Sequence, residues 1–224
     1  MEPEFWPLHQ ACRDATMTST ERLYALFKAV EYVVRAGIPG DFVECGVWRG
    51  GSVMMMALAL QRFGGVGRRL YCFDTFEGMP PPGARDVRND TGMPAAEILS
   101  AADKTADRSV WAIAPLDHVR RNLASTGYPP ELLAYCVGKV EDTLPGSAPA
   151  EIALLRLDTD WYGSTRHELV HLYPRLAAGG VLIIDDYGYW RGARQATDEY
   201  FLETRHKMLL NRIDNTGRIG IKPA

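Results

Sequence analysis

Apolar residues recur along this chain in two alternating patterns, one typical of helices and the other of buried strands. Leu23, Leu26 and Val30 follow one another at the spacing of a single helix face, whereas Val181 to Ile184 is a short continuous apolar run. The patterns predict helices over residues 20–35, 52–63, 116–125, 164–176 and 191–203. They predict strands over residues 41–47, 70–74, 132–137, 152–158 and 181–185, and a closing hairpin over residues 208–213 and 218–221.

The order of these elements predicts the fold class. Strands that alternate with helices build βαβ units, which give an α/β fold with a mostly parallel sheet and helices on both faces. The closing hairpin adds antiparallel strands at the end of the chain. Gly179-Gly180 is expected to break the helix that precedes the last parallel strand. We expect a single domain over residues 1–224.

One stretch, about residues 79–110, does not follow either pattern. It contains Pro80-Pro81-Pro82, Gly83 and Gly92, and its apolar residues have little periodicity. A long irregular insert in a compact domain is usually a functional lid or a disordered segment. We predict a lid that becomes ordered when ligands bind.

Composition and charge exclude several classes of partner. The chain has 224 residues and a formal net charge of −3, so it lacks the basic excess of proteins that bind nucleic-acid backbones. Its longest apolar run, Val53 to Leu60, is too short to cross a bilayer, and we expect no membrane association. The acidic start Met1-Glu2-Pro3-Glu4 is unlike a signal peptide, which predicts a cytoplasmic protein.

A glycine-rich turn after the first predicted strand is the first candidate for chemistry. In Glu44 to Ser52 the glycines allow a ligand to approach the backbone, and the free amides of the following helix suit an anion. The pattern is not GxGxxG, which weakens a dinucleotide interpretation. A carboxylate in an apolar strand needs a partner. Glu44 therefore either faces a cationic or amine-bearing ligand or forms a salt bridge.

Asp74 ends the next predicted strand. An acid at this position of a nucleotide-binding unit accepts hydrogen bonds from ribose hydroxyls. Aspartate also caps turns and helices well, which is the alternative. Because the glycine-rich turn lies upstream, we favour the ribose.

Acidic residues end two further predicted strands. Asp158 and Asp160 follow one apolar run, and Asp185-Asp186 follow another. If these strands are neighbours about 4.8 Å apart, Asp158, Asp185 and Asp186 converge at the carboxyl edge of the sheet, where ligands bind. Because like charges so close disfavour ionisation, and because carboxylates suit Mg²⁺, we predict a metal site. The alternative is that Asp185 and Asp186 cap the next helix.

His167-Glu168-Leu169-Val170-His171 matches the HExxH pattern of zinc peptidases. On a helix this spacing puts both imidazoles on one face. The pattern is short and no third ligand follows in the sequence, so we favour a histidine pair on an outward or packing face.

Four blocks of the chain resemble the macrocin O-methyltransferase (TylF-type) family. The blocks are GDFVECGVWRGG at 40–51, FDTFEGMP at 73–80, LDTDWY at 157–162 and GGVLIIDDY at 179–187. The likeness runs from about Thr16 to the C-terminus. It implies a class I S-adenosylmethionine-dependent methyltransferase fold with a seven-stranded sheet. It also implies Mg²⁺ dependence, methylation of a hydroxyl on a natural-product sugar, and a homodimer or higher assembly.

The resemblance also implies a role for individual residues. The cofactor would lie against Met17, Thr18, Glu44, Gly46, Val47, Asp74, Thr75, Phe76, Glu141 and Asp142. The metal ligands would be Asp158, Asp185 and Asp186, and Asp160 matches the proposed general base. Since vicinal hydroxyls of a sugar or catechol chelate a metal ion, we expect a diol-like small-molecule acceptor.

Two departures from the family's pattern concern the acceptor, and three other classes of protein stay open. Gly163 replaces a residue that is often acidic or polar in the family, and the segment before Met17 is shorter than in antibiotic-pathway members. The alternatives are a nicotinamide-dependent oxidoreductase, a zinc peptidase built on His167 and His171, and a non-catalytic S-adenosylmethionine-binding protein.

Overall fold

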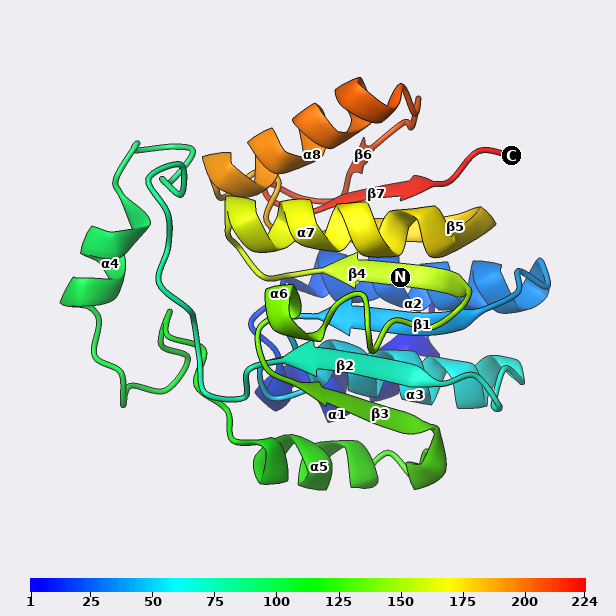
Figure 1. The fold of residues 1–224 in the computed structure, drawn as a ribbon. Helices are drawn as coiled ribbons and strands as arrows, with labels where there is room; N and C mark the ends of the chain where they lie inside the picture. The colour runs from blue at the N-terminus through cyan, green and yellow to red at the C-terminus, as the bar shows by residue number, and fades with distance from the viewer.

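The computed structural model describes residues 1–224, and its central feature is a seven-stranded sheet in the order β3-β2-β1-β4-β5-β7-β6 (Figure 1). The first five strands are parallel, whereas β7 runs antiparallel to both β5 and β6. The strands are β1 (Asp41–Cys45), β2 (Leu70–Asp74), β3 (Leu133–Val137), β4 (Ile152–Leu157), β5 (Leu176–Ile184), β6 (Asn211–Arg212) and β7 (Arg218–Ile221). The predicted sheet with its antiparallel C-terminal hairpin is confirmed.

Helices cover both faces of the sheet, as predicted (Figure 1). One face carries α1 (Phe5–Cys12), α2 (Thr20–Arg35) and α3 (Gly51–Phe63), and the other carries α6 (Val140–Thr143), α7 (Tyr162–Leu172) and α8 (Arg191–Thr204). The helix α5 (Leu116–Ala124) lies beside the β3 edge, and α4 (Ala95–Ala101) lies beyond the sheet. Short 3₁₀ turns occupy Arg13–Ala15, Pro130–Leu132 and Tyr173–Arg175. None of the helices combines the length and the apolar character needed to span a membrane.

Apolar side chains on these elements form one core on each face of the sheet. The α2 residues that set the helical pattern, such as Leu23, Leu26 and Val30, are buried in the first core. Every residue of β4 is buried, because this central strand is covered on both faces. Burial of each such Leu or Ile side chain contributes roughly 1.5–3 kcal/mol, and this burial holds the strand ends in place.

The helix predicted over residues 164–176 is wrong at its C-terminal end, and so is the assignment of Gly179-Gly180 as its break. Helix α7 already ends at Leu172, and Pro174 stands in the turn that follows. Proline cannot donate the amide hydrogen bond that a longer helix needs. The two glycines lie inside β5, where Gly179 has a φ of +80° and the pairing with β4 shifts register. They form an irregularity in a strand.

Three helices were not predicted, and β6 is much shorter than predicted. Helix α1 is short, α6 has only one turn, and α4 lies within the insert that was expected to be irregular. Strand β6 has two residues instead of the predicted 208–213. Short elements such as these are stabilised by tertiary contacts more than by a periodic pattern of their own.

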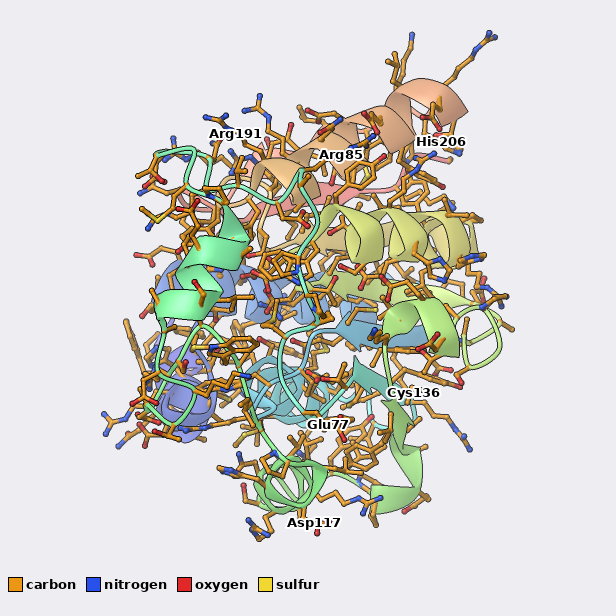
Figure 2. All side chains as sticks on the ribbon, turned by 60° about the vertical axis from the view of Figure 1, so that its left-hand side comes forward. Glu77, Arg85, Asp117, Cys136, Arg191 and His206 are labelled. Carbon is orange, nitrogen blue, oxygen red and sulfur yellow. The ribbon has the colours of Figure 1, made fainter.

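The predicted lid, residues 79–110, extends beyond the carboxyl ends of the parallel strands (Figure 1). Figure 2, which brings this side forward, shows it crossing in front of the strand ends. It is packed through a third, smaller core in which its Ala95 and Leu99 meet Trp161 and Trp190. The buried carboxylate of Asp86 accepts hydrogen bonds at 2.7 Å from the amides of Gly83 and Tyr162. Ordering of this segment on ligand binding stays a prediction.

Candidate active site

A cavity of about 380 Å³ opens at the carboxyl ends of β1, β2, β4 and β5. Its lining combines these strand ends with the segment before α2, the insert and the turn between β6 and β7. It includes most of the predicted site residues, namely Met17, Thr18, Glu44, Gly46, Val47, Asp74, Thr75, Glu141, Asp158, Asp160, Asp185 and Asp186. Phe76 is instead buried in the first core, and Asp142 is exposed on α6. The two side chains therefore lie outside the cavity lining.

The turn after β1 brings backbone, with no side chain in between, against the neighbouring strand end. Gly46 has a φ of +82°, and a Cβ atom there would lie 1.9 Å from the carbonyl oxygen of Asp158. Only glycine permits this approach. A Cβ on Gly51 would lie 2.5 Å from the carbonyl oxygen of Ala15. The glycine-rich motif thus joins the first strand, the N-terminal segment and the acidic strand end.

Asp74 clamps this turn. Its Oδ2 accepts hydrogen bonds from the amides of Val47 at 2.6 Å and Trp48 at 2.9 Å, and its Oδ1 accepts one from the amide of Phe76 at 2.7 Å. The capping role that the sequence left as an alternative is therefore present. A carboxylate has about four lone-pair positions, so capping the turn does not by itself exclude a contact with ribose. The ribose role of Asp74 stays a prediction.

Glu44 forms a buried salt bridge with Arg156, one strand away. The side chains of Glu44 and Arg156 are 1 % and 3 % exposed, and the guanidinium also pairs with Asp158 at 2.8 Å and Asp185 at 2.6 Å. Burial raises the pKa of Glu44 to about 7 against the opposing effect of Arg156. The other oxygen of Glu44, Oε2, is buried without a hydrogen-bond partner. The residue therefore serves a salt bridge and still presents one free acceptor.

The three predicted metal ligands converge. Leu157 of β4 pairs with Ile184 of β5, so the residues that follow these strands lie side by side. Ligand atoms of Asp158, Asp185 and Asp186 all lie within 4.8 Å of one another. Burial is the main reason why the pKa values of Asp158 and Asp186 are raised well above their ordinary range, and repulsion between the carboxylates adds to it. A cation relieves that repulsion.

The donor set fits a hard divalent ion. Asp186 has a buried Oδ2 without a hydrogen-bond partner. Asp185 pairs with Arg156 through one oxygen and with Arg22 through the other. Each carboxylate oxygen has a second lone pair that a metal can use. Oxygen ligands of this kind are those that Mg²⁺ prefers.

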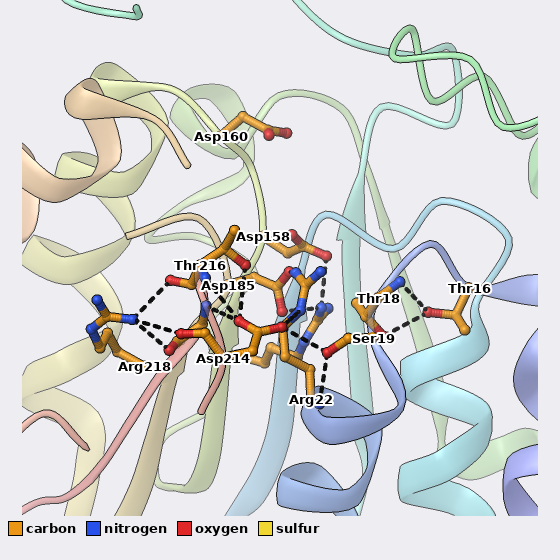
Figure 3. A network of polar contacts seen from close by, with 12 residues as sticks. Thr16, Thr18, Ser19, Arg22, Asp158, Asp160, Asp185, Asp214, Thr216 and Arg218 are labelled. Atoms are coloured by element: carbon orange, nitrogen blue, oxygen red, sulfur yellow. Dashed lines mark hydrogen bonds and ion pairs between the residues drawn. The ribbon is translucent and has the colours of Figure 1, made fainter. Parts of the chain in front are cut away.

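Arg22 and Asp214 belong to the same polar network, and the sequence analysis missed them (Figure 3). Arg22 reaches from α2 to Asp185 and also pairs with Asp214 at 3.0 Å. Although burial opposes it, hydrogen bonds from Ser19 and from amides of the β6–β7 turn lower the pKa of Asp214 to about 2. Arg22 and Asp214 are 192 positions apart by their numbers, and no local pattern relates them.

Asp160 stands apart from the network, on the loop after β4 (Figure 3). Its backbone φ is +66°, and its Oδ1 accepts a hydrogen bond from the indole Nε1 of Trp190 at 2.6 Å. Burial, together with the charge of Asp158, raises the pKa of Asp160 to about 8. The predicted general base therefore lines the cavity close to the three converging carboxylates.

The HExxH residues are divided between two environments. The rings of His167 and His171 lie 4.4 Å apart and are partly exposed, and no third metal-binding side chain joins them. Glu168 is completely buried, and its Oε1 accepts a hydrogen bond from the hydroxyl of Thr159 at 2.8 Å. Glu168 thus supports the loop that carries Asp158 and Asp160.

Solved structures share this fold. The structure of the O-methyltransferase NovP matches with a TM-score of 0.81 and 31 % identity, over 94 % of this chain and 83 % of that chain. A calicheamicin methyltransferase, CalS11, matches with a TM-score of 0.68 and 18 % identity, over 99 % and 93 %. The sheet and the cavity at its carboxyl edge define the class as a class I O-methyltransferase.

The chain belongs to the macrocin-O-methyltransferase (TylF) family, whose model matches residues 5–219. It is 39 % identical over 202 residues, 90 % of this chain and 73 % of the relative, to 8-demethyl-8-(2,3-dimethoxy-alpha-L-rhamnosyl)-tetracenomycin-C 4'-O-methyltransferase of Streptomyces olivaceus. It is 35 % identical to mycinamicin III 3''-O-methyltransferase of Micromonospora griseorubida, over 83 % of this chain and 69 % of the relative. The resemblance seen in the sequence is confirmed, and an O-methyltransferase is favoured over the oxidoreductase, peptidase and non-catalytic alternatives.

Proposed function

We propose that this protein transfers the methyl group of S-adenosylmethionine to a hydroxyl of a small-molecule acceptor, a natural-product sugar, in a reaction that depends on Mg²⁺. The names of the two relatives described above identify glycosylated natural products as their acceptors. The observation that carries the proposal is the convergence of Asp158, Asp185, Asp186 and Asp160 in one cavity with the glycine-rich turn. Cytoplasmic location and assembly as a homodimer or higher oligomer stay predictions.

Residues on one side of the cavity suit the methyl donor. The free Oε2 of Glu44 is an acceptor for the ammonium group or a partner for the positive sulfonium. Gly46 and Val47 border the same space, and Asp74, at the end of β2, would accept hydrogen bonds from the ribose. Met17, Thr18 and Glu141 complete this side of the lining, and Glu141 would lie next to the adenine. We refer to it as the cofactor side.

Residues on the other side suit the acceptor hydroxyl. As the acceptor oxygen bonds to the methyl carbon, the bond from that carbon to sulfur breaks, and the hydroxyl proton passes to Asp160. A positioned general base contributes about 10²–10⁴-fold to the rate. Mg²⁺ held by Asp158, Asp185 and Asp186 would lower the pKa of the hydroxyl and orient a diol-like acceptor. We refer to this side as the acceptor side.

The proposal is tested with purified protein, S-adenosylmethionine and a panel of sugar glycosides and phenols, each with Mg²⁺ and with a chelator. Mass spectrometry of methylated product and S-adenosylhomocysteine measures turnover. We expect product with Mg²⁺ and none with the chelator. Binding of the donor without turnover of any acceptor would contradict the proposal.

Asp185→Asn tests the metal ligands separately. We expect turnover to fall about a hundredfold or more, because a metal contributes several kcal/mol to the transition state. Calorimetry should find the affinity for S-adenosylmethionine largely unchanged and the affinity for Mn²⁺, a probe of the Mg²⁺ site, strongly reduced. The control is Asp117→Asn on α5, which lies at the edge of the molecule in Figure 2 and does not line the cavity. An Asp185→Asn enzyme that keeps full turnover in chelator would refute the metal role.

A further inference from the structure

Asp160 has an uncommon backbone conformation. Its φ of +66° lies in the left-handed region, which residues other than glycine rarely adopt. Such a conformation persists only where surrounding contacts determine it. Side chains from other elements hold this loop: Glu168 and Ser164 of α7 bind Thr159, and Trp190 binds the carboxylate of Asp160 itself.

Trp190 is held rigidly. Its side chain is 1 % exposed, and its ring makes edge contacts with Trp161 and Tyr189 at centroid distances of 5.0 and 4.9 Å. Its backbone amide donates to the carbonyl of Asp186 at 3.0 Å, and its backbone forms a bridge with Arg88 of the insert. The indole N–H therefore points in a direction that the third core and the insert determine together.

The hydrogen bond distinguishes the two oxygens of Asp160. The indole donates to Oδ1 at 2.6 Å, a short distance for an N–H donor to a carboxylate. The indole makes no hydrogen bond to Oδ2, and the Asp160 carboxyl borders the cavity within hydrogen-bond range of Asp186. With Oδ1 anchored by the indole, Oδ2 is the oxygen left to accept from a hydroxyl.

We propose that Trp190 is the positioning residue of the reaction, and that its indole N–H holds the Asp160 carboxylate so that Oδ2 accepts the acceptor's hydroxyl proton. This inference rests on the proposed function and adds to it. The insert thereby influences the chemistry, because its packing against Trp190 sets the position of the proton acceptor.

Trp161 offers a matched comparison within the same core. It is 4 % exposed and contacts Trp190, but its indole N–H donates to the backbone carbonyl of Pro80 in the insert, at 3.0 Å. Replacing either tryptophan with phenylalanine removes one buried indole hydrogen bond from the third core. Only Trp190→Phe removes one from Asp160.

The kinetic test compares Trp190→Phe with Trp161→Phe. Trp190→Phe should lower kcat about ten- to a hundredfold, less than the loss of the base itself, and leave the acceptor KM and the donor Kd within about twofold. Trp161→Phe should keep kcat within about threefold at a similar loss of Tm. Equal losses of kcat in the two variants, or a loss confined to KM, would overturn the proposal, since either result indicates a general packing effect.

A double mutant shows whether Trp190 acts through Asp160. In an Asp160→Asn background, adding Trp190→Phe should cause no further loss of kcat, because the carboxylate that it positions is gone. Losses that multiply would indicate that Trp190 acts by another route and would overturn the proposal.

A measurement without turnover separates this inference from the proposed function. In ¹⁵N-labelled protein, Asp160→Asn should move the indole N–H resonance of Trp190 and leave that of Trp161 in place. An unmoved Trp190 resonance would overturn the inference even if the enzyme is active. Absence of methyl transfer by the unmodified protein would instead refute the proposed function, whatever the resonance does.

Discussion

The two sides of the cavity are built in different ways. The cofactor side comes mainly from two short stretches, 41–52 and 70–76, in which Asp74 binds backbone amides of the turn and glycines allow close backbone approach. The acceptor side is assembled from α2, β4, β5, the start of α8, the β6–β7 turn and the insert. One side therefore depends on backbone geometry within short motifs, and the other on side chains brought together from the whole chain.

Arg156 joins the two sides, since it pairs with Glu44 on one and with Asp158 and Asp185 on the other. We therefore expect its replacement to disturb both sides. If the two sides were energetically independent, replacing Arg156 would break only its own contacts and would not destabilise the rest of either side. The predictions below test this difference between the sides, from the largest expected effect to the smallest.

Arg156→Met should destabilise the protein by about 3–5 kcal/mol, because it leaves buried carboxylates without their cation. Urea unfolding at pH 7 measures the loss, which should shrink at lower pH as these carboxyls take up protons. Arg35→Met is the control, because Arg35 is 71 % exposed and its one ion pair is with Glu31; its cost should stay below about 1 kcal/mol. Equal losses in the two variants would show that the buried network is not a unit.

Glu168→Gln should stabilise the acceptor side in a pH-dependent way. Burial raises the pKa of Glu168 from 4.5 to about 8, so the folded protein retains a proton that the unfolded chain loses. Wild-type stability therefore falls as pH rises from about 4.5 to 8, by up to about 1.4 kcal/mol per pH unit. Glutamine keeps an oxygen for Thr159 and carries no charge, so the variant should be roughly 3 kcal/mol more stable near pH 7 and no more stable near pH 4.

Urea unfolding of both proteins between pH 4 and 8 measures this difference. Glu97→Gln on the exposed face of α4 is the control and should show no comparable trend. A Glu168→Gln variant whose advantage does not grow with pH would mean that Glu168 is ionised in the folded protein.

Asp74→Asn should weaken the cofactor side by the smallest amount. The amide nitrogen cannot accept the hydrogen bonds that the carboxylate receives from the turn, so calorimetry should find the S-adenosylmethionine Kd raised about tenfold, or about 1.4 kcal/mol. The matched control is Asp41→Asn, at the opposite end of β1, which also accepts an amide hydrogen bond, from Arg69 at 2.8 Å. Similar donor affinities in the two variants would place Asp74 outside the donor site.

Much of the fold could be predicted from the sequence because its central elements carry strong local patterns. The apolar runs of β4 and β5 and the helical spacing in α2 each bury a continuous surface. The prediction was wrong at Gly179-Gly180, where glycines typical of a break lie inside a strand. Residues on both sides of the glycines pair with β4, and Gly179 and Gly180 exchange backbone hydrogen bonds with Lys222, so tertiary pairing outweighs local propensity.

The residues of the candidate site likewise fall into those that the sequence predicted and those that it missed. The sequence indicated Asp158, Asp185 and Asp186, because acids at the ends of neighbouring parallel strands must meet at one edge. It gave no sign that Arg22 and Asp214 join them, or that Glu168 of the HExxH motif turns inward to Thr159. These contacts depend on how helices and turns pack over the sheet, and no spacing along the chain encodes that packing.

The sequence by itself determined the mostly parallel sheet, the glycine-rich turn and the family, because each depends on residues close together in the chain. Only the tertiary structure decided which charges are paired and where Asp160 points. Those features arise from contacts between distant segments, such as Trp190 with Asp160 and Arg22 with Asp185. Burial makes such contacts strong, since a charge or an N–H group removed from water must find its partner within the protein.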